Sequence, residues 1–199
     1  MKTKLLSIGN NRKLGKKIGI FNLPQGVTCP GRTALCEKIC YAAKAERLYK
    51  AAATMRVRNL DFISQYGTDG FIAAMRDDIR NSNVTMLRIH ESGDFYSQTY
   101  LDAWVAIVAS CPNVKFLAYT KSFHLDWTAA QALPNWSILW SVDPTTTAAV
   151  PPGATAYLLP KGGIPPAALT CVHTSKKHYC GVECKLCWTG KHNVYFPQH

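Results

Sequence analysis

Short apolar runs alternate with amphipathic stretches along most of this 199-residue chain. Runs rich in β-branched and aromatic residues predict strands at residues 17–23, 84–90, 114–119, 136–142 and 155–159. Apolar residues at helical spacing predict helices at residues 35–63, 71–80, 97–110 and 126–133. Because strands that alternate with helices are typical of βαβ units, we expect an α/β fold with a parallel sheet. Five or six strands are too few for a closed eight-stranded barrel, so an incomplete, TIM-like partial barrel or an open sheet fits better.

After Pro160 the regular pattern gives way to Gly, Pro and Cys. We therefore expect an α/β domain over residues 1–160 and an irregular, cysteine-rich segment over residues 161–199 that packs on it. A bound metal would organise this segment, since it has no core of its own.

Seven of the eight cysteines fall into two groups near the ends of the chain. Such groups hold a structural zinc ion, an iron–sulfur cluster or disulfides. The first 17 residues are basic and lack the apolar core of a secretory signal, and no apolar run is long enough to cross a membrane. These features favour the reducing cytoplasm, where cysteine groups bind metals more often than they form disulfides.

The C-terminal group contains Cys171, Cys180, Cys184 and Cys187, followed by Trp188. Three cysteines spaced three and two residues apart suit one face of a [4Fe-4S] cluster. The fourth ligand would be Cys171, or one of Cys36 and Cys40 if the two ends of the chain fold together. Zinc is the alternative, with His173 or His178 as further candidate ligands.

The N-terminal group contains Cys29, Cys36 and Cys40. Its position between the first predicted strand and the first predicted helix is where α/β folds place their active sites. Three thiolates would hold a second [4Fe-4S] cluster and leave one iron open, whereas one or two of them could instead pack in the core. Cys111, which stands alone before Pro112, fits a small buried apolar residue.

Polar side chains follow three successive predicted strands, and together they suggest a site at one edge of the sheet. The candidate catalytic residues are His90, Glu91, Asp94 and Lys121, and the candidate cofactor-binding residues are Ser92, Gly93, Tyr119 and Asp143. Gly93 permits a sharp turn after the strand. Taken singly, Asp94 also fits a turn or helix cap, and His90 a structural histidine.

The net charge of +11 lies entirely in residues 1–58, which hold 13 Lys and Arg but only Glu37 and Glu46 as acids. A basic field of this kind attracts nucleic acid or another anionic partner, although it also suits a solvated surface.

As a set, these motifs resemble the phage gene-product-88-like family. The matching stretches are the Cys29, Cys36 and Cys40 group, the His90–Phe95 segment, Tyr119–Ser122, and the closing cysteines with Trp188 and His199. The resemblance implies a phage protein that acts in the cytoplasm of an infected host cell.

More loosely, the layout is similar to radical S-adenosylmethionine enzymes, which place a three-cysteine cluster after the first strand of a partial barrel. That similarity implies S-adenosylmethionine as a further cofactor. The N-terminal spacing departs from their three-then-two pattern, however, and no glycine-rich cofactor segment follows a strand.

The leading hypothesis is an iron–sulfur protein with one or two [4Fe-4S] clusters and redox or radical chemistry at the sheet edge. The alternatives are a zinc-stabilised nucleic-acid-binding module, and a non-catalytic electron carrier or structural cluster protein.

Overall fold

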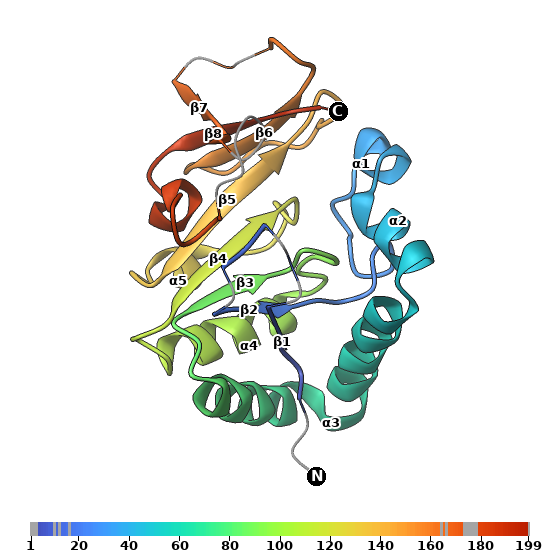
Figure 1. The fold of residues 1–199 in the computed structure, drawn as a ribbon, viewed down its shortest axis with the longest axis vertical. Helices are drawn as coiled ribbons and strands as arrows, with labels where there is room; N and C mark the ends of the chain where they lie inside the picture. The colour runs from blue at the N-terminus through green and yellow to red at the C-terminus, as the bar shows by residue number, and fades with distance from the viewer. Residues whose placement is uncertain are drawn as a thin grey trace.

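The computed structural model describes residues 4–9, 11, 13–15, 17–163, 165, 167–172 and 179–198. Within these residues, eight strands form one open sheet in the order β1-β2-β3-β4-β5-β6-β8-β7 (Figure 1). The strands are β1 (Ser7–Ile8), β2 (Ile18–Phe21), β3 (Met86–Ile89), β4 (Lys115–Thr120), β5 (Trp136–Val142), β6 (Thr155–Leu159), β7 (Ala168–Thr170) and β8 (Asn193–Pro197). Only β1 pairs antiparallel with its neighbour. The expected α/β fold with a mostly parallel sheet is confirmed, whereas the narrower expectation of a partial barrel stays a prediction.

Strand register brings the connections that follow β2, β3, β4 and β5 to one edge of the sheet. Phe21 lies opposite Ile89, and Ile89 lies opposite Ala118. Since these strands are parallel, their carboxyl ends meet at that edge, where ligands bind in open α/β sheets.

The predicted helix over residues 35–63 is in fact three helices, namely α1 (Ala34–Lys38), α2 (Tyr41–Leu48) and α3 (Lys50–Ser82). Cys40 and Tyr49 have non-helical backbone angles and separate them. Helical propensity is high throughout this stretch, and its sequence contains no proline or glycine to mark the breaks. Tertiary packing therefore decides where each helix ends.

The predicted helix over residues 71–80 belongs to α3, which bends at Gly67. Gly67 has φ 67° and ψ −174°, a conformation that essentially only glycine adopts. The remaining helices are α4 (Gln98–Ala109), α5 (Thr128–Gln131) and the 3₁₀ helix η2 (Leu186–Thr189).

Alternate residues of the strands build two hydrophobic layers on opposite faces of the sheet. On β4, Phe116 and Ala118 face a large core shared with α3 and α4, whereas Leu117 faces a second, smaller cluster. The second cluster also contains Trp188 from η2, and Cys171 and Cys187 pack against it. The C-terminal segment thus covers the sheet face opposite α3 and α4.

The C-terminal segment also supplies strands β7 and β8, which the sequence pattern did not indicate. β8 lies between β6 and β7, and both of its neighbours run parallel to it. The hydroxyl of Ser137 on β5 donates to the carbonyl of Trp188 (2.8 Å). Residues 161–199 therefore share a sheet with residues 1–160 through the part of the chain that the structure describes.

Candidate functional site

The N-terminal cysteines lie on the connection between β2 and α2, beyond the carboxyl end of the sheet. Cys29 follows the turn at residues 25–28, Cys36 is within α1, and Cys40 immediately precedes α2; all three are half-buried. Burial raises the pKa of the Cys29 thiol to about 11, and the neighbouring charges of Asp94, Cys36 and Cys40 add to this rise. The three sulfur atoms are thus close enough to act on one another electrostatically.

Close backbone contacts hold this connection against the ends of β3 and β4. The carbonyl of Thr28 accepts a hydrogen bond from the amide of Asp94 (3.0 Å). A Cβ atom on Gly31 would lie 2.0 Å from the carbonyl oxygen of Lys121, and one on Gly93 would lie 2.7 Å from the hydroxyl of Thr28. Gly93 also has a positive φ of 83°, so the predicted sharp turn is present. Glycine at 31 and 93 lets three segments meet where any side chain would clash.

Asp94 is buried where these segments meet. Its carboxylate accepts hydrogen bonds from the hydroxyl of Thr120 (2.7 Å) and from the amides of Lys121 and Phe95 (2.8 Å each). Burial raises the pKa of Asp94, and these hydrogen bonds oppose part of the rise. Asp94 therefore ties the end of β3 to the end of β4.

Lys121 and Asp143 form an ion pair between the ends of β4 and β5, with 2.8 Å between Nζ and Oδ2. Nζ also donates to the carbonyl of Ser141 (3.0 Å), and the hydroxyl of Thr33 donates to Asp143 (2.5 Å). Burial raises the pKa of the Cys36 thiol, and the Lys121 ammonium opposes part of that rise. Asp94, Lys121 and Asp143 thus gather beside the N-terminal cysteines, as the positions of the strand ends predicted.

His90 faces the opposite way, into the large core. Its Nε2 atom lies 2.8 Å from the hydroxyl of Tyr100, and its ring packs at 4.7 Å from the ring of Phe95. Burial lowers the pKa of His90 to about 3, so the ring is neutral near pH 7. His90 was expected to share a site with the N-terminal cysteines, but its ring lies in the core instead. This placement agrees with the other expectation, that of a structural histidine.

Glu91 and Ser92 follow His90 after the end of β3. The side chain of Glu91 accepts a hydrogen bond from Asn11, and its carbonyl accepts one from Tyr41. Ser92 is buried, and its carbonyl accepts from the amide of Leu23 (3.0 Å). Both residues join β3 to the N-terminal part of the chain.

The C-terminal cysteines converge on the other face of the sheet. Cys171 follows β7, and Cys187 is in η2. Cys180 and Cys184 are joined by a backbone β-bridge within one turn, and their thiols are free. Burial raises the pKa of Cys180, and the charges of Cys171 and Cys184 raise it further. Burial likewise raises the pKa of Cys187 to about 11, with Cys171 and Cys180 adding to the effect. Cys180 therefore interacts electrostatically with each of the other three cysteines.

Arg88 and Tyr119 lie on the sheet face that carries the C-terminal cysteines. The Arg88 guanidinium lies 3.9 Å from the centre of the Tyr119 ring, and Tyr119 is hydrogen-bonded to Cys187. The charge of Arg88 favours the ionised forms of Cys180 and Cys187, since it lowers the pKa of both. Tyr119 was predicted to lie in the same site as Asp94, but its side chain faces the C-terminal cysteines. The sequence did hold a signal for Arg88, namely a lone cation inside an apolar strand.

Among the described residues, no group of three or more His, Cys, Asp and Glu side chains is already arranged to hold a metal ion. His173, His178 and His199 lie outside the described residues. Cys111 is partly buried and packs against the large core, whereas full burial was expected.

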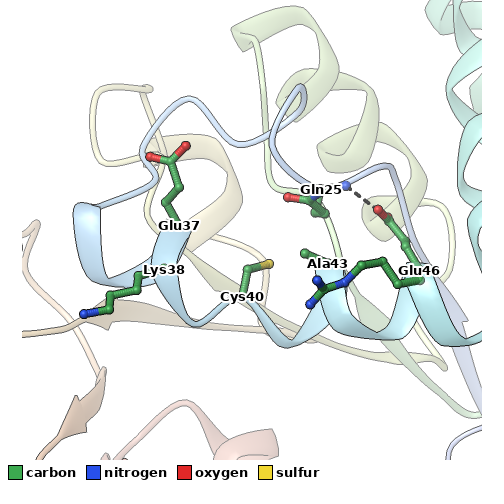
Figure 2. A pocket seen from close by; sticks show the side chains of 7 residues that line it. Gln25, Glu37, Lys38, Cys40, Ala43 and Glu46 are labelled. Carbon is green, nitrogen blue, oxygen red and sulfur yellow. Dashed lines mark hydrogen bonds between the residues drawn. The ribbon is translucent and has the colours of Figure 1, made fainter.

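An open pocket of about 540 Å³ adjoins the N-terminal cysteines. In Figure 2 the Cys40 side chain lies between Lys38 and Glu37 on one side of the pocket and Glu46 on the other. Seven residues line it: Gln25, Glu37, Lys38, Cys40, Ala43, Glu46 and Arg47. The pocket offers both carboxylates and cations to a polar ligand beside Cys40.

No helix in the described part of the chain is both long and apolar enough to cross a membrane.

Comparison with known proteins gives a family match over nearly the whole chain. A family model described as Gene product 88 matches residues 2–190. A Gene 88 protein of Mycobacterium phage L5 is 30% identical over 215 residues, covering 90% of this chain and 87% of that protein. A Gene 88 protein of Mycobacterium phage D29 is 33% identical over 141 residues, covering 64% of this chain and 59% of that protein. No solved structure matches the chain.

Proposed function

The chain belongs to the Gene product 88 family of phage proteins, and from this premise we propose that it is an iron–sulfur redox protein of the infected cell. The family resemblance expected from the sequence is confirmed, but the family's name states no activity. The proposal therefore depends on one observation: seven cysteines gather in two groups whose members act on one another electrostatically.

The C-terminal four cysteines suit a complete [4Fe-4S] cluster. A cubane of this kind takes four thiolates, and Cys171, Cys180, Cys184 and Cys187 supply that number from one turn, one 3₁₀ helix and the end of a strand. The nearby guanidinium of Arg88 would offset part of the cluster's negative charge. Metal binding would have to draw these thiols closer together than the structure has them.

The N-terminal three cysteines suit a second cluster with one iron left without a thiolate. Lys121 would balance negative charge beside Cys36, and Asp143 would keep the ammonium in place. Asp94 would hold the ends of β3 and β4 together beneath the cluster. When bound, such a cluster would supply one-electron transfer to a molecule in the adjoining pocket.

The interpretation of the sheet as a partial barrel belongs to the same proposal. It is supported by the run of parallel neighbours from β2 to β6 in chain order. The looser similarity to radical S-adenosylmethionine enzymes gains no support from the family match, so we do not propose that cofactor.

Zinc is the second candidate, because four thiolates also suit a tetrahedral structural site. Iron, zinc and acid-labile sulfide should be measured per chain, with the visible spectrum, on protein purified without oxygen. Two clusters predict about eight iron and eight sulfide atoms, and one cluster predicts about four of each. One zinc ion without sulfide would contradict the iron–sulfur proposal.

Variants assign the clusters to their cysteines. Cys184→Ala/Cys187→Ala should remove the C-terminal cluster, and Cys36→Ala/Cys40→Ala should remove the N-terminal cluster, each lowering iron by about four atoms. Cys111→Ala is the matched control and should leave the iron content unchanged. If the N-terminal pair also leaves it unchanged, that group holds no cluster.

A further inference from the structure

Apolar and aromatic side chains are exposed on α2 and on the first turns of α3. Tyr41, Leu48 and Tyr49 are exposed by 63%, 63% and 65%, and Val57 by 49%. Single exposed apolar residues are normal on protein surfaces, but here four occur within 17 residues of the chain. Exposed apolar groups gathered in this way mark interaction sites more often than scattered ones do.

Exposed cations are interleaved with these side chains, at Lys38, Lys44, Arg47, Lys50 and Arg58. Within the described residues, none of the five lies within ion-pair distance of a carboxylate. The two acids of this region are occupied elsewhere, since Glu37 pairs with Arg32 (3.5 Å) and Glu46 with the buried Arg56 (3.0 Å). The surface therefore carries an uncompensated positive charge.

Helical spacing places the two kinds of side chain together. Tyr41, Lys44 and Leu48 are three and then four residues apart, so they share one side of α2. Tyr49 and Lys50 follow at the junction of α2 with α3. Figure 1 shows α1, α2 and the first half of α3 running along one side of the molecule. We call the surface formed by the exposed side chains between Lys38 and Arg58 the α2–α3 face.

We propose that the α2–α3 face binds single-stranded nucleic acid. The cations would contact successive phosphates, and unpaired bases would stack on the exposed rings, the combination that single-strand binders use. Tyr41 is suited to this role because its hydroxyl is held by the carbonyl of Glu91 while the residue stays exposed. A duplex would offer the phosphates but not the faces of its bases, so it should bind more weakly.

This proposal goes beyond the redox function and does not require a cluster. The two sites are neighbours, however, since Lys38 and Arg47 belong to the face and also line the pocket that contains Cys40 (Figure 2). A bound strand would therefore pass beside the N-terminal cysteines.

The first test measures fluorescence anisotropy of a labelled oligothymidine of about 20 nucleotides with the full chain at rising salt. Lys44→Glu/Arg47→Glu should weaken binding at least about tenfold and reduce the salt dependence by about 1.4 in log–log slope, the value for two lost phosphate contacts. Lys115→Glu/Lys191→Glu makes the same change in charge at the amino ends of β4 and β8 and should alter binding less than about twofold.

The second test separates stacking from charge. Tyr49→Leu keeps an apolar side chain but removes the ring and should weaken binding about fivefold or more, whereas Tyr49→Phe should bind like the wild type. Circular dichroism of each variant checks that the fold is retained.

Three results would overturn the proposal. These are the absence of binding by the wild type, an equal loss in both double variants, and a duplex of the same length that binds as tightly as the single strand. The last result, with Tyr49→Leu unchanged, would mean that the face recognises only phosphate charge.

Discussion

Burial determines the charge state of His90. The residue is 3% exposed and its ring contacts the hydroxyl of Tyr100, and its pKa is lowered to about 3 from an ordinary value of 6.5. The unfolded chain therefore binds a proton between these two values that the folded chain excludes. The stability that the neutral His90 ring contributes is fully present above about pH 6.5 and is lost as the pH drops toward 3.

For His90→Gln we expect the free energy of unfolding to depend less on pH. The wild type should lose up to about 1.4 kcal/mol more per pH unit than the variant as the pH falls from 6 to 4.5. Urea unfolding at several pH values measures this difference. Parallel profiles for the two proteins would mean that His90 is protonated in the fold.

The ion pair of Lys121 and Asp143 is buried, because the two side chains are 11% and 1% exposed. Burial alone would raise the pKa of Asp143, but hydrogen bonds from Lys121, Thr33 and Thr145 outweigh it and lower the pKa to about 2 from 3.8. The stability that Asp143 contributes is thus present above about pH 4 and is lost as the pH falls toward 2.

We expect Asp143→Asn to lower the free energy of unfolding by about 3 kcal/mol at pH 7, because it leaves the Lys121 ammonium without its partner. Asp77→Asn is the matched control, since its pair with Arg80 is exposed, and it should change stability by less than about 1 kcal/mol. Equal effects of the two substitutions in urea unfolding would contradict a structural role for the buried pair.

At the scale of elements, the connection from β2 to α2 is positioned by backbone contact more than by side-chain packing. Gly31 lies against the carbonyl of Lys121, and no residue of α1 is buried. The N-cap of α1 is Thr33, whose side chain accepts from the amide of Cys36 (3.2 Å) and donates to Asp143. A small change at Gly31 should therefore move the N-terminal cysteines as a unit.

Gly31→Ala should displace this connection and destabilise the protein by about 1–3 kcal/mol, as overpacking does elsewhere. Because the shift is local, it should alter the reactivity of Cys29 and Cys36 toward a thiol reagent and leave Cys187 unchanged. Alkylation followed by mass spectrometry measures each site. Unchanged reactivity at all three cysteines would show that Gly31 does not position the connection.

At the scale of the whole molecule, the two faces of the sheet are covered by different parts of the chain. α3 and α4 cover one face, and the C-terminal segment covers the other through Trp188. β8 pairs with β6, so the end of the chain also completes the sheet. The C-terminal cysteines are thereby attached to the same sheet whose carboxyl edge carries the N-terminal ones.

Trp188→Ala should lower the free energy of unfolding by about 3–5 kcal/mol, because it leaves a cavity over Leu117 and Leu139. Denaturant unfolding followed by circular dichroism tests this, and a single transition should remain. A separate early transition in the wild type would instead indicate that the C-terminal segment unfolds independently.

Sequence pattern alone determined the central strands and the family. The runs at residues 136–142 and 155–159 match β5 and β6 to the residue. Segments rich in β-branched and aromatic side chains favour the extended conformation of a strand over other secondary structures. The order of strand ends likewise placed Asp94, Lys121 and Asp143 together, since parallel strands must deliver their carboxyl ends to one edge.

Only the tertiary structure decided the rest. The direction in which the side chains of His90 and Tyr119 point depends on the face of the sheet to which each belongs. A shift of one residue in strand register would reverse that face. The breaks at Cys40 and Tyr49 and the short strands β7 and β8 depend on contacts with distant segments, which local propensity does not contain. The two cysteine groups were visible in the sequence, but only folding attached both to one sheet and brought Arg88 and Tyr119 beside the C-terminal group.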